Sequence, residues 1–168
     1  DKVIQSWLEK GRIEKCPYSP YLNALIVVDK APVNDERSIR VCLNPKPLNA
    51  NTLKMPYPMV NIPQLLLKLT GFKVFSKLDL SESFLQFQLD KADRFKTAFQ
   101  WQSQLYQFVG APFGLRNISF HVQSVMTEIF SDMGDTVAVY IDDIIVFSHS
   151  QEEHVDHLRQ VVERLELY

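Results

Sequence analysis

The chain has 168 residues, of which 46% are hydrophobic and 23% are charged, and its formal net charge is −2. This length fits one compact domain, or one domain with a smaller lobe, and the hydrophobic fraction is enough for a buried core, which excludes a wholly disordered chain. No apolar stretch reaches the roughly 20 residues that cross a bilayer, and the N-terminus lacks the apolar segment of a signal peptide, so we expect a soluble protein. Two cysteines, Cys16 and Cys42, are too few for a disulfide framework or a zinc site and indicate a reducing compartment.

The charges are distributed unevenly along the chain. Residues 1–60 carry nine Lys or Arg against six Asp or Glu, residues 61–127 carry seven against four, and residues 128–168 carry two against ten. A basic front and an acidic end favour phosphate contacts early in the chain and metal or solvent contacts late in it. Alone, this asymmetry is weak evidence, because charged surfaces are common.

The first part of the chain predicts a helix, a hairpin and an extended connector. Residues 1–15 predict a short amphipathic helix that stops at Gly11, with its apolar side chains near helical spacing at Val3, Ile4, Trp7 and Leu8. An apolar run ending at Lys30, a polar turn and a second apolar run at residues 39–43 predict a β-hairpin. Five prolines between residues 44 and 63 forbid a long regular element and predict an extended connector.

The remainder predicts a mixture of helices and strands. We expect helices at residues 62–70, ending at Gly71, and at 118–133 and 150–168, the last with a serine cap. We expect strands at residues 72–80, 84–90 and 135–148, and a hairpin at 96–110. In the segment 84–90, Leu85, Phe87 and Leu89 alternate with Gln86 and Gln88, which is typical of a strand.

Two adjacent carboxylates, Asp142 and Asp143, interrupt an otherwise apolar run at residues 137–148. Unpaired carboxylates are costly in an apolar environment, so the fold must expose them at a turn, neutralise them or give them a cation. An ordinary hairpin turn is one interpretation, because Asp favours turns. A structural calcium site is disfavoured, because the flanks offer no further oxygen ligands at loop spacing. The third interpretation is a Mg²⁺ site at the rim of a sheet, for phosphoryl or nucleotidyl transfer.

The Mg²⁺ hypothesis requires a further carboxylate from a different strand. Asp79, which closes the predicted strand at residues 72–80, meets this requirement. A carboxylate at a strand end beside a hairpin-borne pair can hold two metal ions about 3.5–4 Å apart. Alone, Asp79 is as readily explained as a cap before Ser81. Together, the three aspartates favour metal chemistry.

Seven motifs occur in order along nearly the whole chain: SPYLNALIVVDK, IRVCLNPKPLN, PYPMVNIPQLL, FSKLDLSESFLQFQL, RFKTAF, YQFVGAPFGLRN and YIDDIIVFS. This ordered set closely resembles the reverse transcriptase of Gypsy-type long-terminal-repeat retrotransposons and retroviruses, whereas YIDD alone would be only suggestive. The resemblance implies an α+β fold, with the fingers and palm subdomains of a right-hand polymerase, an antiparallel palm sheet packed on helices, and no thumb. It assigns residues 1–63 and 91–115 mainly to the fingers, and residues 64–90 and 116–168 mainly to the palm.

The resemblance also implies roles at the site of nucleotidyl transfer. Asp79, Asp142 and Asp143 match the catalytic palm aspartates, which hold two Mg²⁺ ions, or Mn²⁺ in their place, for attack of a primer 3′-hydroxyl on a deoxynucleoside triphosphate (dNTP). Tyr140 matches the residue that packs under the hairpin near the primer terminus. Lys46 occupies the place of a basic residue on the template side.

Five positions match residues that contact the incoming nucleotide. Phe84 matches the aromatic steric gate that crowds the sugar 2′ position, although a core Phe is the usual explanation for such a residue. Arg40 matches the arginine that grips the triphosphate, and Lys30 is a second cation in an atypical loop. Either could instead be a solvated surface charge. Phe113 and Gly114 would line the floor of the nucleotide site.

Four positions depart from the pattern of the family. Arg116 replaces Thr, Ser119 replaces Pro and Val122 replaces Phe, which puts helix packing beside the site and template handling in doubt. Asn44 stands where Asp is common. The three catalytic carboxylates are all present.

The resemblance implies several partners. A primed RNA or DNA template and dNTPs are the expected ligands, and the thumb, ribonuclease H and integrase of a polyprotein are expected downstream, with no membrane partner. Because affinity for nucleic acid depends on summed phosphate contacts, we expect weak synthesis from this span alone. We expect a cytoplasmic location in virus-like particles, or a nuclear one for a domesticated copy.

Two other functions remain open. An RNA-dependent RNA polymerase shares the palm carboxylates, but Phe84 argues against it. A domesticated or excised fragment could instead be a non-catalytic module that binds nucleic acid or protein.

Overall fold

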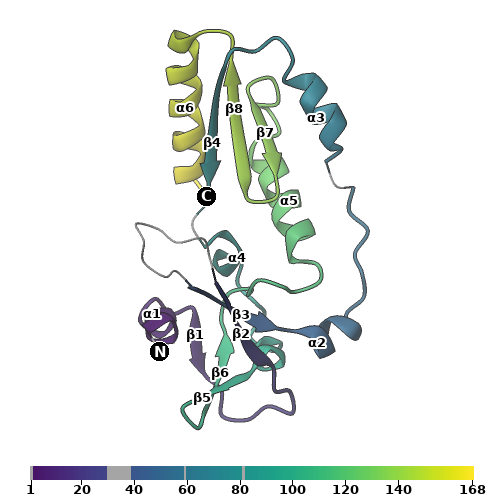
Figure 1. Cartoon of the computed structure of the whole chain (residues 1–168), viewed down its shortest axis with the longest axis vertical. Helices are drawn as coiled ribbons and strands as arrows, with labels where there is room; N and C mark the ends of the chain where they lie inside the picture. The colour runs from purple at the N-terminus through teal and green to yellow at the C-terminus, as the bar shows by residue number, and fades with distance from the viewer. Residues whose placement is uncertain (1, 30–38, 59, 81) are drawn as a thin grey trace. The chain divides into compact units, whose positions relative to one another are not determined.

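The computed structural model describes residues 2–29, 39–58, 60–80 and 82–168. Its helices and antiparallel sheets confirm the predicted α+β class (Figure 1). Among the described residues, no helix is long and apolar enough to span a membrane.

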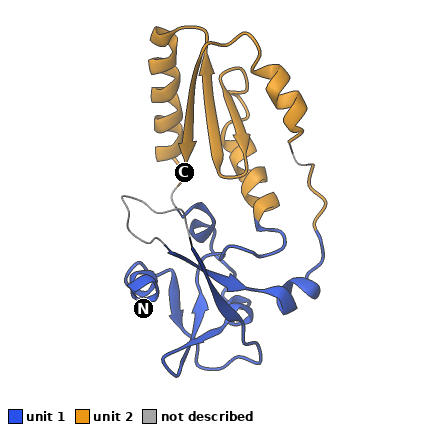
Figure 2. Cartoon of the chain, in the orientation of Figure 1, with its two compact units in different colours: residues 1–54, 82–118 blue, residues 55–81, 119–168 orange. Residues whose placement is uncertain are grey.

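The chain folds as two units (Figure 2). Unit 1 comprises residues 1–54 and 82–118, and unit 2 comprises residues 55–81 and 119–168. The chain therefore enters each unit twice. The residue boundaries predicted for fingers and palm stay predictions.

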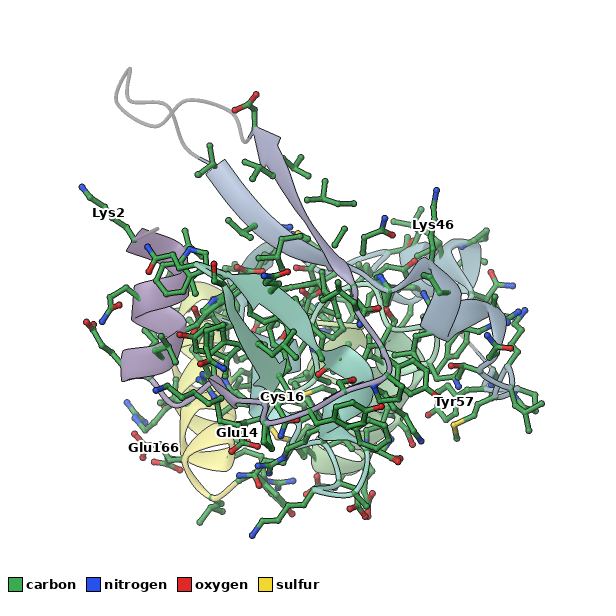
Figure 3. The ribbon with its side chains drawn as sticks, turned by 90° about the horizontal axis from the view of Figure 1, so that it is seen from below. Lys2, Glu14, Cys16, Lys46, Tyr57 and Glu166 are labelled. Carbon is green, nitrogen blue, oxygen red and sulfur yellow. The ribbon has the colours of Figure 1, made fainter. Side chains whose placement is uncertain are left out.

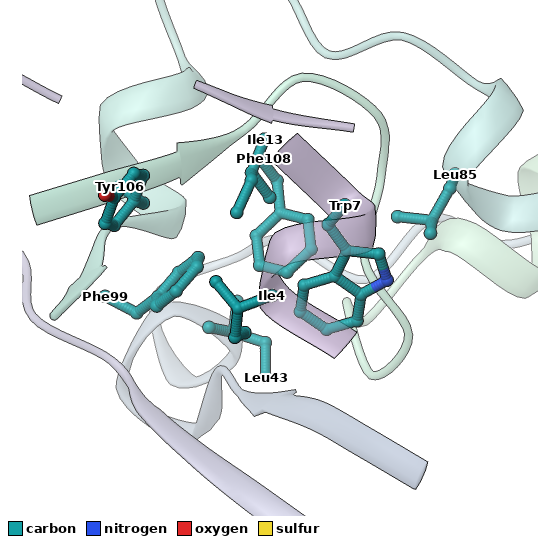
Figure 4. Close-up of a cluster of buried hydrophobic side chains, with 8 residues drawn as sticks. All are labelled: Ile4, Trp7, Ile13, Leu43, Leu85, Phe99, Tyr106 and Phe108. Atoms are coloured by element: carbon teal, nitrogen blue, oxygen red, sulfur yellow. The ribbon is translucent and has the colours of Figure 1, made fainter. Parts of the chain in front are cut away.

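A three-stranded antiparallel sheet and one helix enclose the core of unit 1. The sheet has the order β1-β6-β5, formed by Ile13–Lys15, Gln104–Phe108 and Phe99–Trp101. Helix α1 spans Lys2–Glu9 and ends before Gly11, whose φ of 63° is readily adopted by glycine, as predicted. The buried cluster in Figure 4 consists of Ile4, Trp7, Ile13, Leu43, Leu85, Phe99, Tyr106 and Phe108.

The antiparallel strand pair of the predicted N-terminal hairpin is confirmed, and its predicted turn lies outside the described residues. Strands β2 (Ala24–Asp29) and β3 (Ile39–Asn44) pair antiparallel, with Val28 opposite Arg40. Lys30, one of the predicted triphosphate ligands, lies outside the described residues. Arg40 is the second residue of β3, next to the Asp29–Ile39 pair at which the described ladder ends.

The proline-rich connector is not wholly extended, because helix α2 (Lys46–Ala50) forms within it. Pro45 and Pro47 occupy the N-cap and the second helical position, where the absence of a proline N–H breaks no helical hydrogen bond. The exposed side chain of Lys46 projects from the start of this helix (Figure 3).

The predicted strand at residues 84–90 is wrong. Ser83–Gln86 form the short helix α4, and the only strand-like pairing in this described stretch is an isolated bridge between Gln88 and Gly110. Both Phe84 and Leu85 are buried, which a half-buried strand with alternating faces does not allow. The 3-10 helix η1 (Arg94–Thr97) then leads into the confirmed hairpin of β5 and β6.

Unit 2 contains a second three-stranded antiparallel sheet, in the order β4-β8-β7. Its strands are β4 (Val74–Asp79), β8 (Asp143–Ser148) and β7 (Val137–Tyr140). Its helices are α3 (Ile62–Lys68), α5 (Ile118–Ile129) and α6 (Gln151–Glu166). The predicted serine cap of α6 is confirmed, because the Ser150 hydroxyl accepts a hydrogen bond from the Glu153 N–H at 3.2 Å.

The two faces of this sheet have different surroundings. His154 of α6 is only 4% exposed, and its ring nitrogens hydrogen-bond the hydroxyls of Ser76 and Ser148, each at 2.8 Å. These two serines therefore mark the face that packs on α6. Because side chains alternate along a strand, Asp79 and Asp143 lie on the opposite face.

Candidate active site

Strand register brings two of the predicted catalytic aspartates together. Asp79 is the last residue of β4, Asp143 is the first residue of β8, and the two are direct partners across the antiparallel ladder. Residues paired in this way have Cβ atoms about 4.5–5.5 Å apart and point to the same face. The fold therefore places two carboxylates from segments 64 residues apart at one edge of the sheet of unit 2.

The third aspartate lies in the tight turn between β7 and β8. Tyr140 and Asp143 are paired, so Ile141 and Asp142 form a two-residue turn. Ile141 has a φ of 59°, a left-handed conformation that is strained for a β-branched residue. Such strain persists only where surrounding contacts hold the backbone in place, and it is common at functional sites.

The contact that holds this turn comes from Gln123 of α5, a residue that the sequence reasoning missed. Its side chain is fully buried, and its Oε1 accepts a hydrogen bond from the Ile141 N–H at 2.7 Å. Its Nε2 donates to the Val139 carbonyl at 3.3 Å and to the Thr127 hydroxyl at 3.1 Å. The sequence signal was a glutamine three residues before the buried Met126, on the apolar face of a helix.

The sequence reasoning also missed Lys77. This residue lies two positions before Asp79 on β4, and therefore on the same face of the sheet. Its Nζ lies 2.9 Å from Oδ2 of Asp143, in an ion pair. The hydrogen bond and charge of Asp143 raise the pKa of Lys77, and the charges of Asp79 and Asp142 add to this effect. All three carboxylates therefore favour the charged form of Lys77.

The three aspartates fit a divalent metal ion in donor type and in backbone register. Carboxylate oxygens are the ligands that Mg²⁺ prefers. Within the described parts of the chain, no three His, Cys, Asp or Glu side chains are already gathered into a metal-binding cluster. Asp143 is instead paired with Lys77.

Three of the predicted nucleotide contacts come together in unit 1. The rings of Phe84 and Phe113 meet edge to face, with their centroids 4.6 Å apart. The guanidinium carbon of Arg40 lies 5.4 Å from the centroid of Phe113, in a cation–π contact. Gly114 follows with a φ of 98°, and a Cβ at this position would lie 3.3 Å from Cδ of Pro45. The structure therefore groups an aromatic pair and a cation in unit 1, and their roles at a nucleotide stay predictions.

The substituted residue Arg116 joins this loop to α2. Its N–H donates to the Asn49 side chain at 2.9 Å, and its guanidinium donates to the carbonyls of Asn49 and Thr52 at 3.0 and 3.1 Å. Asn49 in turn donates to the Gly114 carbonyl at 2.7 Å. The arginine that replaces Thr therefore adds two guanidinium hydrogen bonds from this loop to α2 and the turn after it.

Comparison with known proteins identifies the sequence family. Residues 28–168 match the family model of reverse transcriptase (RNA-dependent DNA polymerase). The chain is 35% identical over 161 residues to the Retrovirus-related Pol polyprotein from transposon gypsy of Drosophila melanogaster, covering 94% of this chain and 16% of that protein. It is 37% identical to the corresponding polyprotein from transposon opus of the same fly, covering 98% of this chain and 17% of that protein.

Solved structures show the same fold. The native prototype foamy virus protease-reverse transcriptase has a TM-score of 0.84 and 24% identity, over 98% of this chain and 21% of that chain. The foamy viral protease-reverse transcriptase dRH in complex with ds DNA also has a TM-score of 0.84, with 21% identity over 98% of this chain and 28% of that chain. This likeness confirms the predicted polymerase fold.

The chain spans only 16–17% of the length of the transposon polyproteins it matches. The family model nevertheless covers all but the first 27 residues. The chain belongs to the reverse transcriptase (RNA-dependent DNA polymerase) family.

Proposed function

We propose that this chain is the RNA-directed DNA polymerase core of a retroelement polyprotein. In this proposal it transfers a nucleotide from a dNTP to a primer 3′-hydroxyl with two divalent metal ions. The observation that carries the proposal is the register of β4 and β8, which pairs Asp79 with Asp143 beside the turn that bears Asp142. Like charges directly opposite each other on an antiparallel sheet destabilise the fold, and a bound metal ion is the interaction that would offset this cost.

The three aspartates are the proposed ligands of Mg²⁺, or of Mn²⁺. When bound, the divalent ions supply the positive charge that lowers the pKa of the primer hydroxyl and stabilises the pyrophosphate leaving group. Asp79 and Asp143 hold their positions through the ladder, and Asp142 holds its position through the turn that Gln123 fixes. Little rearrangement of the backbone is then required of these residues during the reaction.

The aromatic pair of unit 1 is the proposed sugar selector. Phe84 is 6% exposed and is held edge-on by Phe113, so its ring has little freedom to yield to a 2′-hydroxyl. The guanidinium carbon of Arg40 lies 5.4 Å from the centroid of Phe113, and the planar fork of N–H donors on a guanidinium suits a triphosphate. Gly114 keeps the adjoining loop free of a side chain. This arrangement favours a deoxynucleotide over a ribonucleotide.

The proposed macromolecular ligand is a primer paired with an RNA or DNA template. Related structures support this choice, because foamy viral protease-reverse transcriptase has been seen in complex with ds DNA and with an RNA/DNA hybrid. Tyr140, paired with Asp143, is proposed to contact the primer end, and the exposed Lys46 the template. The proposed protein partners are the remaining domains of a polyprotein, including a thumb, ribonuclease H and integrase. The proposed location is the cytoplasm.

A primer-extension assay under single-turnover conditions tests the proposal. Protein in excess over a primed RNA template is mixed with one dNTP and Mg²⁺, and addition of one nucleotide is measured for the wild type, Asp142→Asn and Asp156→Asn. Asp156 is a matched control, because it is an exposed aspartate of unit 2 in an ion pair with Arg159 on α6. Binding of the primed template is measured in parallel.

We expect incorporation by the wild type and by Asp156→Asn, and at least a 100-fold loss in Asp142→Asn with template binding retained. Equal incorporation by all three proteins would contradict the assigned site. A wild type that binds template and Mn²⁺ but incorporates nothing would favour the non-catalytic binding module instead.

A further inference from the structure

The strand that ends at Asp79 carries its own cation beside the carboxylates. Lys77 and Asp79 are two residues apart, and Lys77 reaches diagonally across the ladder to Asp143, the direct partner of Asp79. Diagonal neighbours on one face of an antiparallel pair are within reach of a long side chain. The contact between Nζ and Oδ2, at 2.9 Å, is an ion pair with hydrogen-bonding distance.

The local charge explains why a lysine is stable at this position. Asp79 and Asp143 are direct partners at one edge of the sheet, and Asp142 lies in the turn next to them. Among the ion pairs of the described residues, the pair with Lys77 is the one that involves any of these aspartates. Without a metal ion, this ammonium offsets part of a concentrated negative charge.

The same contact opposes metal binding. An ammonium and a divalent ion require the same oxygen lone pairs of Asp143, and both cannot use Oδ2 fully at once. Asp143 is paired with Lys77 through this oxygen. The ion pair and a metal ion bound at Oδ2 of Asp143 are therefore alternatives.

The ion pair is also weak enough to be displaced. The Lys77 side chain is 63% exposed, so its four-carbon stem can move the ammonium into water without breaking a packed contact. Exposed ion pairs contribute little to stability. A divalent ion that contacts several carboxylates outcompetes a single ammonium, but at a higher metal concentration than a site without the lysine would need.

We propose that Lys77 is a built-in counter-cation that holds Asp143 in the metal-free protein and is displaced when a divalent ion binds. Lys77 thereby weakens metal binding and sets the metal concentration at which the carboxylates assemble. This inference rests on the proposed function for the assignment of Asp79, Asp142 and Asp143 as ligands. Lys77 is a positioning residue in this scheme.

Direct measurement of Mn²⁺ binding tests the inference without any activity assay. Free Mn²⁺ is followed by electron paramagnetic resonance during titration of the wild type, Lys77→Met, Lys77→Gln and Lys77→Arg. The control is Lys73→Met, which makes the same charge change at an exposed position six residues, or about 20 Å, from Asp79 along the strand. Asp142→Asn reports whether the bound Mn²⁺ is at the carboxylates.

We expect Lys77→Met and Lys77→Gln to bind Mn²⁺ about two- to five-fold more tightly than the wild type, the range typical of an exposed ion pair. Lys77→Arg should bind as the wild type does, and Lys73→Met should change affinity by less than about 1.5-fold, since its charge is largely screened at that distance. The lysine Nζ resonance of Lys77 should also shift on addition of Mg²⁺.

Two outcomes would overturn the inference. Mn²⁺ binding that Asp142→Asn abolishes, but that is equal in Lys77→Met, Lys77→Gln and Lys73→Met, refutes the role of Lys77 and leaves the proposed function standing. Absence of Mn²⁺ binding in the wild type, or binding that Asp142→Asn leaves unchanged, refutes the metal site and the inference together. Circular dichroism of each variant identifies any protein that has lost its fold.

Discussion

The buried amide of Gln123 offers a specific test of how the fold positions the catalytic turn. Replacing Gln123 with Leu keeps a side chain of similar size in α5 but removes the acceptor for the Ile141 N–H at 2.7 Å and the donor to the Val139 carbonyl at 3.3 Å. A part-buried donor left without its partner costs about 1–2 kcal/mol, and loss of the longer bond adds about 0.5 kcal/mol. We therefore expect unit 2 to lose about 2 kcal/mol of stability.

The effect should be concentrated at the turn. Amide hydrogen exchange of Ile141 should accelerate about 30-fold in Gln123→Leu, since 2 kcal/mol of lost protection corresponds to that factor. Nucleotide incorporation should fall about 10- to 100-fold at a temperature where the variant remains folded, because Asp142 is no longer held in position.

Thr127→Val is the matched control, because it removes only the hydrogen bond from Gln123 Nε2 at 3.1 Å. We expect a loss of about 0.5–1 kcal/mol and nearly normal exchange at Ile141. The reasoning would be refuted if Gln123→Leu and Thr127→Val had equal effects, or if Gln123→Leu accelerated exchange at Ile141 without reducing incorporation.

Three further predictions concern other parts of the chain. Gly110→Ala should destabilise unit 1 by about 3 kcal/mol, because the added Cβ would collide with the backbone carbonyl of Leu85. Urea unfolding followed by tryptophan fluorescence measures this loss of stability, since both tryptophans lie in unit 1. Phe84→Val should raise the ratio of ribonucleotide to deoxynucleotide incorporation about 10- to 100-fold in competition assays. Hydrogen bonding by Arg164 lowers the pKa of Asp132 from its ordinary value of 3.8, so this pair stabilises the fold above pH 3.8 and loses that effect as the pH falls below it. Asp132→Asn should therefore be less stable than the wild type at pH 7. The difference in stability should shrink below pH 3.8, which acid denaturation of both proteins measures.

Regular alternation and end signals made much of the fold predictable from sequence. The glycine at the end of α1 and the serine at the start of α6 both act as expected. The strand-like run that ends at Asp79 also predicts β4, with its carboxylate at the end of the strand. Each of these signals depends on neighbours within a few positions.

Two segments differ from expectation, for different physical reasons. The segment 84–90 alternates like a strand, but buried neighbours surround both Phe84 and Leu85, and packing outweighs the local pattern. The connector was expected to be extended because of its prolines, yet Pro45 and Pro47 fall where a helix tolerates them. Tertiary packing decided the first segment, and the positions of the prolines at the start of a helix decided the second.

The roles of Gln123 and Lys77 were not predictable, because each depends on a partner far along the chain. Gln123 meets Ile141 only once α5 packs under the turn, and its signal in the sequence is one polar residue on an apolar stripe. Lys77 meets Asp143 only through the register of two strands. Exposed lysines are common, so nothing in the local sequence distinguishes this one.

The most direct test of the central claim is addition of a single dNTP to a primed RNA template by the wild type, Asp79→Asn, Asp143→Asn and Asp156→Asn under identical Mg²⁺ conditions. The strand register predicts that Asp79→Asn and Asp143→Asn both lose at least 100-fold of the single-turnover rate, while Asp156→Asn keeps it. Incorporation that survives in either Asp79→Asn or Asp143→Asn would contradict a catalytic centre built on this pair.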